Sequence, residues 1–72
     1  MRPQNMKMTL KTARELAGFT QAEAAEKIGV NPDTIGNYER GRSYPDIPTL
    51  RKIEAAYGVS YNQLIFLPLD FG

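Results

Sequence analysis

The sequence predicts an all-α domain built from five short helices. Helix-capping residues and glycine or proline stops recur along the chain, and the apolar residues between them repeat at helical spacing. No run alternates apolar and polar residues in the way that marks a strand. With 72 residues the chain is expected to form one compact domain, because so short a chain buries only ~60% of its unfolded surface.

The first two helices are predicted from their capping residues. Thr9 is a suitable N-cap for a helix over residues 10–17, which a glycine follows. Thr20 and Glu23 have the spacing of a capping box, which opens a second helix over residues 21–28. A third helix over residues 32–40 follows from an Asn-Pro start, since Asn favours the N-cap and Pro the first helical position.

The last two helices are shorter or less regular. Pro48 is tolerated only in a first turn, so the fourth helix begins near Asp46, and Gly58 ends it. A second capping box over residues 60–63 predicts a short fifth helix, which Pro68 ends. Residues 1–8 lack periodicity and are expected to form a flexible arm.

The composition excludes several classes of function. The chain has no Cys and no His, so disulfides, the usual zinc sites and Ser–His or Cys–His catalysis are not expected. We therefore expect no enzyme, no metal, no cofactor and no small-molecule ligand. No export signal or apolar stretch near the ~20 residues of a membrane span is present, which predicts a cytoplasmic protein without a membrane partner. A net charge of +1 indicates no particular partner.

The short connection over residues 29–31 sets the second and third helices at a large angle, as in a helix-turn-helix. Ala25 is small enough for close helix contact, Gly29 permits the turn, and Ile35 fills the space between the helices. Over residues 9–66 the chain resembles the Xre/Cro/phage-repressor (lambda-repressor-like) family of helix-turn-helix DNA-binding proteins. The resembling positions are residues 20–25, 28–30, Ile35, residues 38–42, Pro45, Leu50, Ile53, residues 57–60 and Leu64.

The resemblance implies a role for each helix. The helix-turn-helix formed by helices two and three would place helix three in the major groove of double-stranded DNA. Gln21, at the start of helix two, would contact a phosphate. Arg14 and Glu39 match a partly buried ion pair between helices one and three, for which a structural role is favoured over a functional one.

Four positions of helix three are candidate base contacts. Ile35 and Tyr38 face inward, so the opposite face presents polar or small residues. Asn37 can pair with adenine N6 and N7, unless it is only a solvated amide. Asp33 can accept from cytosine N4 or merely offset the helix dipole. The full set of candidates is Pro32, Asp33, Gly36 and Asn37.

Two of these candidates differ from a simple base reader. Pro32 stands where family members often carry a Gln, so it offers only apolar contact to a thymine methyl. Gly36 costs ~1 kcal/mol in a helix interior, which close approach of backbone to DNA would explain, although simple tolerance would too.

Phosphate contacts are expected around helix three. Arg40 and Arg42 bracket a glycine, a clamp by position, although an exposed basic loop is the alternative. Most acidic residues lie outside helix three, so the small net charge is compatible with a polarised surface. The candidate phosphate contacts are Gln21, Thr34, Arg40, Arg42, Ser43 and Lys11.

The apolar C-terminal tail, residues 67–72, exceeds what the core needs. Leu64 and Ile65 are expected to close the core, and the apolar residues beyond them to contact a second copy. The alternatives are a tail folded back on its own domain and a chain cut from a longer one. The candidate dimer contacts are Phe66, Leu67, Leu69 and Phe71.

The sequence therefore predicts a sequence-specific transcriptional regulator. We expect a repressor of the phage or prophage type that occludes a palindromic operator as a homodimer. The alternative is a helix-turn-helix scaffold that acts as a protein-interaction module, antitoxin-like or as a regulatory partner. Pro32, Asp33, the small net charge and the apolar tail favour that alternative, whereas Asn37, Arg40 and Arg42 favour DNA.

Overall fold

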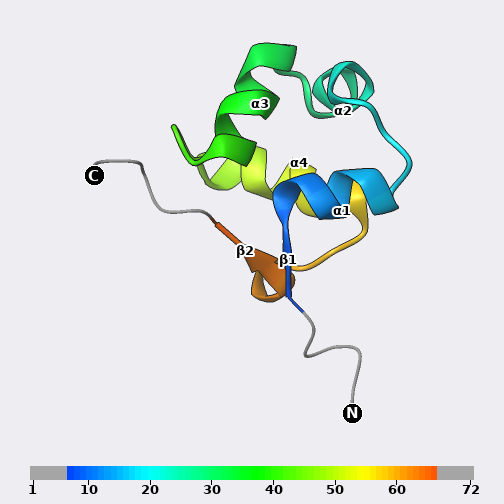
Figure 1. Ribbon diagram of the computed structural model, residues 1–72, viewed down its shortest axis with the longest axis vertical. Coiled ribbons are helices and arrows are strands. Elements are labelled where there is room, and N and C mark those ends of the chain that lie inside the picture. The colour runs from blue at the N-terminus through cyan, green and yellow to red at the C-terminus, as the bar shows by residue number, and fades with distance from the viewer. Residues whose placement is uncertain (1–6, 67–72) are drawn as a thin grey trace.

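Four helices form the domain, which we describe from a computed structural model over residues 7–66 (Figure 1). The elements in chain order are β1 (Met8–Thr9), α1 (Leu10–Leu16), α2 (Gln21–Ile28), α3 (Pro32–Arg40), α4 (Ile47–Tyr57), the 3₁₀ turn η2 (Tyr61–Gln63) and β2 (Leu64–Ile65). The helices α2 and α3 lie at one end of the molecule and the two strands at the other (Figure 1). The predicted bounds of the second and third helices are confirmed, and the first ends one residue early.

Side-chain caps fix where three of the helices begin. The hydroxyls of Thr9 and Thr20 and the carboxylate of Asp46 each accept a hydrogen bond from the backbone N–H three residues later. At α2 the reciprocal bond is present too, because the Thr20 N–H donates to Glu23 Oε1 at 2.9 Å. Asn31 makes no such bond, and α3 relies on Pro32 at its first position.

The helices also end in a common way, with a Schellman motif. At α3, Gly41 adopts φ 77°, a left-handed conformation that favours glycine, and the next N–H, of Arg42, donates to Asn37 O at 2.9 Å. The equivalent N–H bonds at the ends of α1, α2 and α4 come from apolar residues packed on the core, Phe19, Val30 and Val59. At α3 that position holds an exposed arginine instead.

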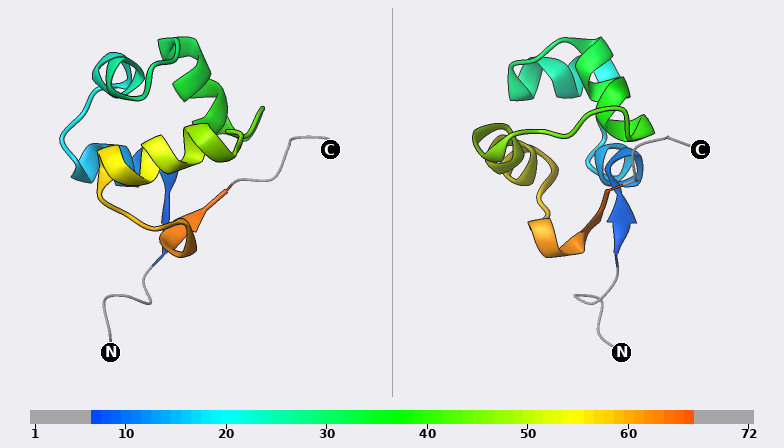
Figure 2. Two further views of the ribbon diagram at one scale, coloured as in Figure 1. Left: turned by 180° about the vertical axis from the view of Figure 1, so that it is seen from behind. Right: turned by 90° about the vertical axis from the view of Figure 1, so that its left-hand side faces the viewer.

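The core lies between the four helices, with α4 lying beside α1 and below α2 (Figure 2). Its largest fully buried side chains are Ile28, Ile35 and Ile53, one from each of α2, α3 and α4. Leu64 is also buried, so the prediction that it closes the core is confirmed, whereas Ile65 is exposed.

The prediction of a fifth helix is wrong. The capping box of Ser60 and Gln63 exists, but it encloses only η2, and Leu64 and Ile65 form the strand β2. Leu64 and Ile65 pair in parallel with Met8 and Thr9, so Met8, assigned to the arm by its sequence, lies in a strand. A helix of one or two turns is marginal by itself, and burial of Leu64 beside β1 favours the extended form.

Residues 1–6 of the expected arm and the tail, residues 67–72, lie outside the described residues. Among residues 7–66, no helix is both long and apolar enough to cross a membrane.

Candidate nucleic-acid interface

The helices α2 and α3 pack closely around small and branched side chains. Ala24 and Ala25 are buried, which lets the two helices approach, and Ile35 is only 1% exposed beneath them. Gly29 adopts φ 90°, and the following N–H, of Val30, donates to Ala25 O at 3.0 Å. The turn predicted from these residues is therefore present, and it fixes how α3 projects from the domain (Figures 1 and 2).

The outward face of α3 carries the candidate base contacts. Pro32 and Asp33 are exposed at its start, and Asn37 is half-buried one turn further on. On the inward face Tyr38 is half-buried, and this burial raises the pKa of its hydroxyl. The periodicity predicts that this face is polar, and Pro32, Asp33 and Asn37 are indeed in contact with solvent.

Gly36 is buried although it lies on this outward face. The cover is Arg40: a Cβ added to Gly36 would lie 3.2 Å from Arg40 Nη1 and 3.7 Å from its Cζ. The same guanidinium donates from Nη2 to Asn37 Oδ1 at 2.9 Å. Arg40 thus folds back along α3 and brings together three of the residues predicted to contact DNA.

Arg42 and Ser43 are exposed just beyond the end of α3. The Schellman bond from the Arg42 N–H ties the backbone of this segment to the last turn of the helix. The side chain of Arg42 therefore extends from a backbone position fixed beside α3, the region in which phosphate contacts are predicted.

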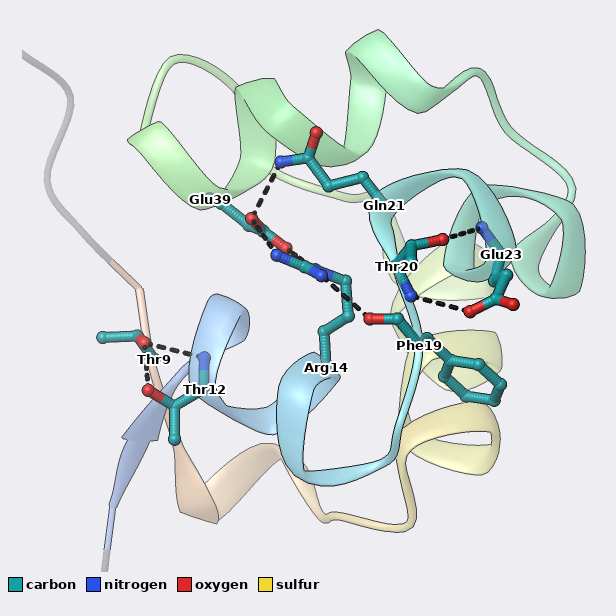
Figure 3. A network of polar contacts seen from close by, with 8 residues as sticks. All are labelled: Thr9, Thr12, Arg14, Phe19, Thr20, Gln21, Glu23 and Glu39. Carbon is teal, nitrogen blue, oxygen red and sulfur yellow. Dashed lines mark hydrogen bonds and ion pairs between the residues drawn. The ribbon is translucent and has the colours of Figure 1, made fainter.

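A buried network behind α3 joins three helices (Figure 3). Arg14 donates from Nε to Glu39 Oε2 at 2.6 Å and from Nη2 to Oε1 at 3.2 Å. Its third donor, Nη1, contacts Phe19 O at 2.9 Å. The two charged side chains are only 8% and 6% exposed, and the hydrogen bond with Glu39 raises the pKa of the Arg14 guanidinium. This geometry gives the predicted pair its structural role.

Gln21 also belongs to this network. Its Nε2 donates to Glu39 Oε1 at 3.1 Å, although the side chain is largely exposed (Figure 3). Glu39 therefore accepts from both Arg14 and Gln21. The amide has a second N–H that this bond does not use.

The remaining candidates are less closely connected. Thr34 is half-buried in the first turn of α3, and Lys11 is exposed on α1. Within residues 7–66, neither side chain is hydrogen-bonded to Asn37 or Arg40. Phe66 is half-buried, its ring centroid lying 6.1 Å from that of Tyr44 and 5.9 Å from that of Tyr61.

Sequence reasoning missed two of these connections. The Arg40–Asn37 bond joins residues three apart on one helix, a spacing at which side chains meet, so the signal was present. The bond from Gln21 to Glu39 crosses between two helices and leaves no such local signal.

A family model described as Helix-turn-helix matches residues 10–64. The chain belongs to the Cro/C1-type helix-turn-helix family. Among curated relatives it is 46% identical over 56 residues to the HTH-type transcriptional regulator ImmR of Bacillus subtilis, covering 78% of this chain and 44% of ImmR. It is 36% identical over 56 residues to YonR, a SPbeta prophage-derived HTH-type regulator of the same organism, covering 78% of this chain and 52% of YonR.

A second group of family members comes from eukaryotes. Endothelial differentiation-related factor 1 of Homo sapiens is 40% identical over 50 residues, covering 69% of this chain and 34% of that protein. The chain thus spans about half, or less, of the length of these relatives. No solved structure matches it. Both Bacillus subtilis relatives are named as HTH-type transcriptional regulators.

Proposed function

We propose that the chain is a sequence-specific double-stranded DNA-binding regulator of transcription. The observation that carries the proposal is the outward face of α3, where Asp33, Asn37 and Arg40 face solvent opposite the fully buried Ile35. Such a helix, carried on a helix-turn-helix, fits the major groove with its polar side chains toward the base edges. Pro32 and Gly36 belong to the same surface, Pro32 as an apolar contact to a thymine methyl.

Phosphate contacts would position this helix without reading sequence. Arg42 and Ser43 lie beyond the C-terminus of α3, while Gln21 and Thr34 lie near the starts of α2 and α3. The exposed arginine at a position where the other helices carry core residues supports a role outside the fold. Lys11 and Arg40 complete the proposed phosphate set.

Repression would follow from occlusion. The prophage origin in the name of YonR supports a phage-type repressor, in which the bound protein blocks polymerase at a palindromic operator. Two copies would place their α3 helices in successive major grooves ~34 Å apart. Acting in this way needs no cofactor.

The test is DNA binding measured at two salt concentrations with random duplexes and with a sequence selected from a random library. Asn37→Ala is expected to weaken binding to the selected sequence more than to random DNA. Arg42→Ala should weaken both alike and reduce the salt slope by about one unit. Lys52→Ala is the matched control, since Lys52 is exposed on α4, outside the proposed phosphate set and outside the groove beside that helix. Affinity independent of salt would sink the proposal.

Dimerisation is proposed through the surface around Phe66. An open groove beside α4 is lined by Tyr44, Ile47, Tyr61 and Phe66, and Ile47 is 62% exposed. The other proposed contacts, Leu67, Leu69 and Phe71, lie outside the described residues. Sedimentation should show a dimer on the selected DNA that Ile47→Glu weakens, whereas one copy per half-site with no coupling would contradict it.

The same groove favours a second candidate function, a protein-interaction module. A family member of Candida albicans, 40% identical over 50 residues, is named multiprotein-bridging factor 1. An apolar groove rimmed by Arg51 and Glu54 suits a partner protein segment better than DNA. The salt series separates the two functions, because a chain used only as a protein scaffold would bind random duplex DNA without a steep salt dependence.

A further inference from the structure

The position of Arg40 changes what Asn37 can read. An asparagine that reads adenine uses Oδ1 to accept from N6 and Nδ2 to donate to N7. Here Oδ1 already accepts from Arg40 Nη2 at 2.9 Å. Arginine has donors only, so the oxygen of the amide must face it and Nδ2 must face away.

Oδ1 keeps a second lone pair, but a donor that approached it would lie beside the positively charged guanidinium, so the unit formed by Asn37 and Arg40 presents mainly donors. The amide offers the two N–H groups of Nδ2, and the guanidinium offers those N–H groups not used in the internal bond. A guanine shows two acceptors in the major groove, O6 and N7, while an adenine shows one acceptor and one donor. A unit that presents mainly donors matches the two acceptors of guanine better than the mixed pattern of adenine.

Gly36 is what allows this arrangement. The guanidinium lies against the glycine, because a Cβ there would come within 3.2 to 3.7 Å of Nη1, Nη2 and Cζ. The 3.2 Å approach is tighter than ordinary contact, so a methyl group would force the guanidinium to shift by a few tenths of an ångström. The residue has no positive φ, so its backbone would accept alanine without strain.

We propose that Asn37 and Arg40 act as one recognition unit, seated on Gly36, that selects guanine rather than adenine in each operator half-site. The inference rests on the proposed DNA-binding function and names the base that this site takes. It also changes the parts assigned to two residues: Gly36 becomes the seat of the arginine instead of a direct base contact, and Arg40 becomes part of the base-reading unit instead of a phosphate contact.

The experiment is selection of bound duplexes from a random library with the full chain and four variants. The base that faces the unit is identified as the position whose preference changes in Asn37→Ala. In the unmodified protein we expect guanine there, favoured over adenine by about tenfold or more, as good bidentate contacts allow. Adenine at that position would overturn the inference.

Gly36→Ala tests the seat without weakening the fold. Alanine favours a helix interior, so the midpoint of thermal unfolding should rise. The guanine preference should nevertheless fall severalfold, because the shifted guanidinium holds the amide of Asn37 less firmly. An unchanged preference would overturn the proposal, as would an equal loss of affinity for every sequence, which would instead indicate a methyl group that blocks the approach of the backbone to DNA.

Two further variants complete the test. Asn37→Asp keeps an acceptor for Arg40 but removes both amide donors, so it should abolish the guanine preference. Arg42→Ala should lower affinity for all sequences and leave the preference intact. Loss of all salt-dependent binding in the unmodified protein would defeat the proposed function and this inference together, whereas a salt-dependent protein that selects adenine defeats the inference alone.

Discussion

Glu39 and Arg40 are neighbours on α3 that point to different sides of the helix, one buried and one exposed. Each forms hydrogen bonds in which one partner is charged. Glu39 is buried among donors from two other elements, Arg14 and Gln21. Arg40 is exposed, and its described partner, Asn37, is on its own helix. One bond therefore joins parts of the fold, and the other only arranges a surface.

The difference teaches how one helix can be both fixed and available. A buried carboxylate with several donors cannot change partners without leaving a charge unpaired in the core. An exposed guanidinium can exchange one partner for another at little cost, because water screens both states. The same helix thus has a side that holds it in place and a side that is free to meet a ligand.

The largest expected effect comes from breaking the buried pair. Arg14→Ala leaves Glu39 without its main partner, and we expect a loss of about 3–5 kcal/mol in the free energy of unfolding. Since a small domain has only ~5–15 kcal/mol in total, this loss would remove a large share of its stability. Urea denaturation followed by circular dichroism measures the loss.

A double variant sharpens this result. Replacing both members, as in Arg14→Met with Glu39→Leu, removes the charges together and should recover most of the lost stability. If the single and double variants were equally unstable, the hydrogen bonds from Arg14 to Phe19 O and from Gln21 to Glu39 would matter more than the charge pair.

The exposed side should behave in the opposite way. Arg40→Ala is expected to change the free energy of unfolding by no more than about 0.5 kcal/mol, because the side chain is exposed and joins no second element. Its affinity for a selected DNA sequence should nevertheless fall. A stability loss near that of Arg14→Ala would erase the distinction between the two sides of α3.

The smallest effect on stability is expected at Asp46, whose side chain is exposed like that of Arg40 but helps to hold the fold like that of Glu39. Asp46 is exposed, yet its carboxylate accepts from the Thr49 N–H and caps α4. This hydrogen bonding lowers the pKa of the carboxyl below its usual value of 3.8. Because the lowered pKa belongs to the folded state, the stabilisation is complete above the unfolded value and is lost as the pH falls through the folded one.

Asp46→Asn provides the comparison. Asparagine caps a helix about as well but does not titrate, so the variant should be slightly less sensitive to acid than the unmodified chain below pH 4 and similar to it at neutral pH. Urea midpoints measured at several pH values check this. Parallel pH profiles for the two proteins would contradict the assigned role.

Local signals gave most of the fold. The capping threonines, Asp46 and the glycines act within one turn, so the bounds of α1 to α4 could be predicted from the sequence. The β1–β2 pairing could not, because it joins residues at opposite ends of the described chain and each strand has only two residues. The fifth helix was predicted wrongly because the capping box is a local signal, whereas the pairing of Leu64 and Ile65 with β1 is not.

The candidate site was predicted less completely than the fold. The outward face of α3 followed from the burial of Ile35, and the resemblance supplied the pairing of Arg14 with Glu39. Periodicity places side chains on a face but gives neither their rotamers nor their partners. The fold of Arg40 over Gly36 depends on both, and it changes which base Asn37 is expected to read.

The two-residue parallel ladder also brings together segments near the two ends of the described chain. Since β1 and β2 lie side by side, the ends of the described chain could be joined by a linker and the chain reopened elsewhere, with every helix keeping its neighbours. An opening after Ser43, in the exposed segment between α3 and α4, would leave Arg42 near a new chain end. Such a permuted chain would keep the fold, because β1 and β2 still pair, while loosening the position of the proposed phosphate contact Arg42.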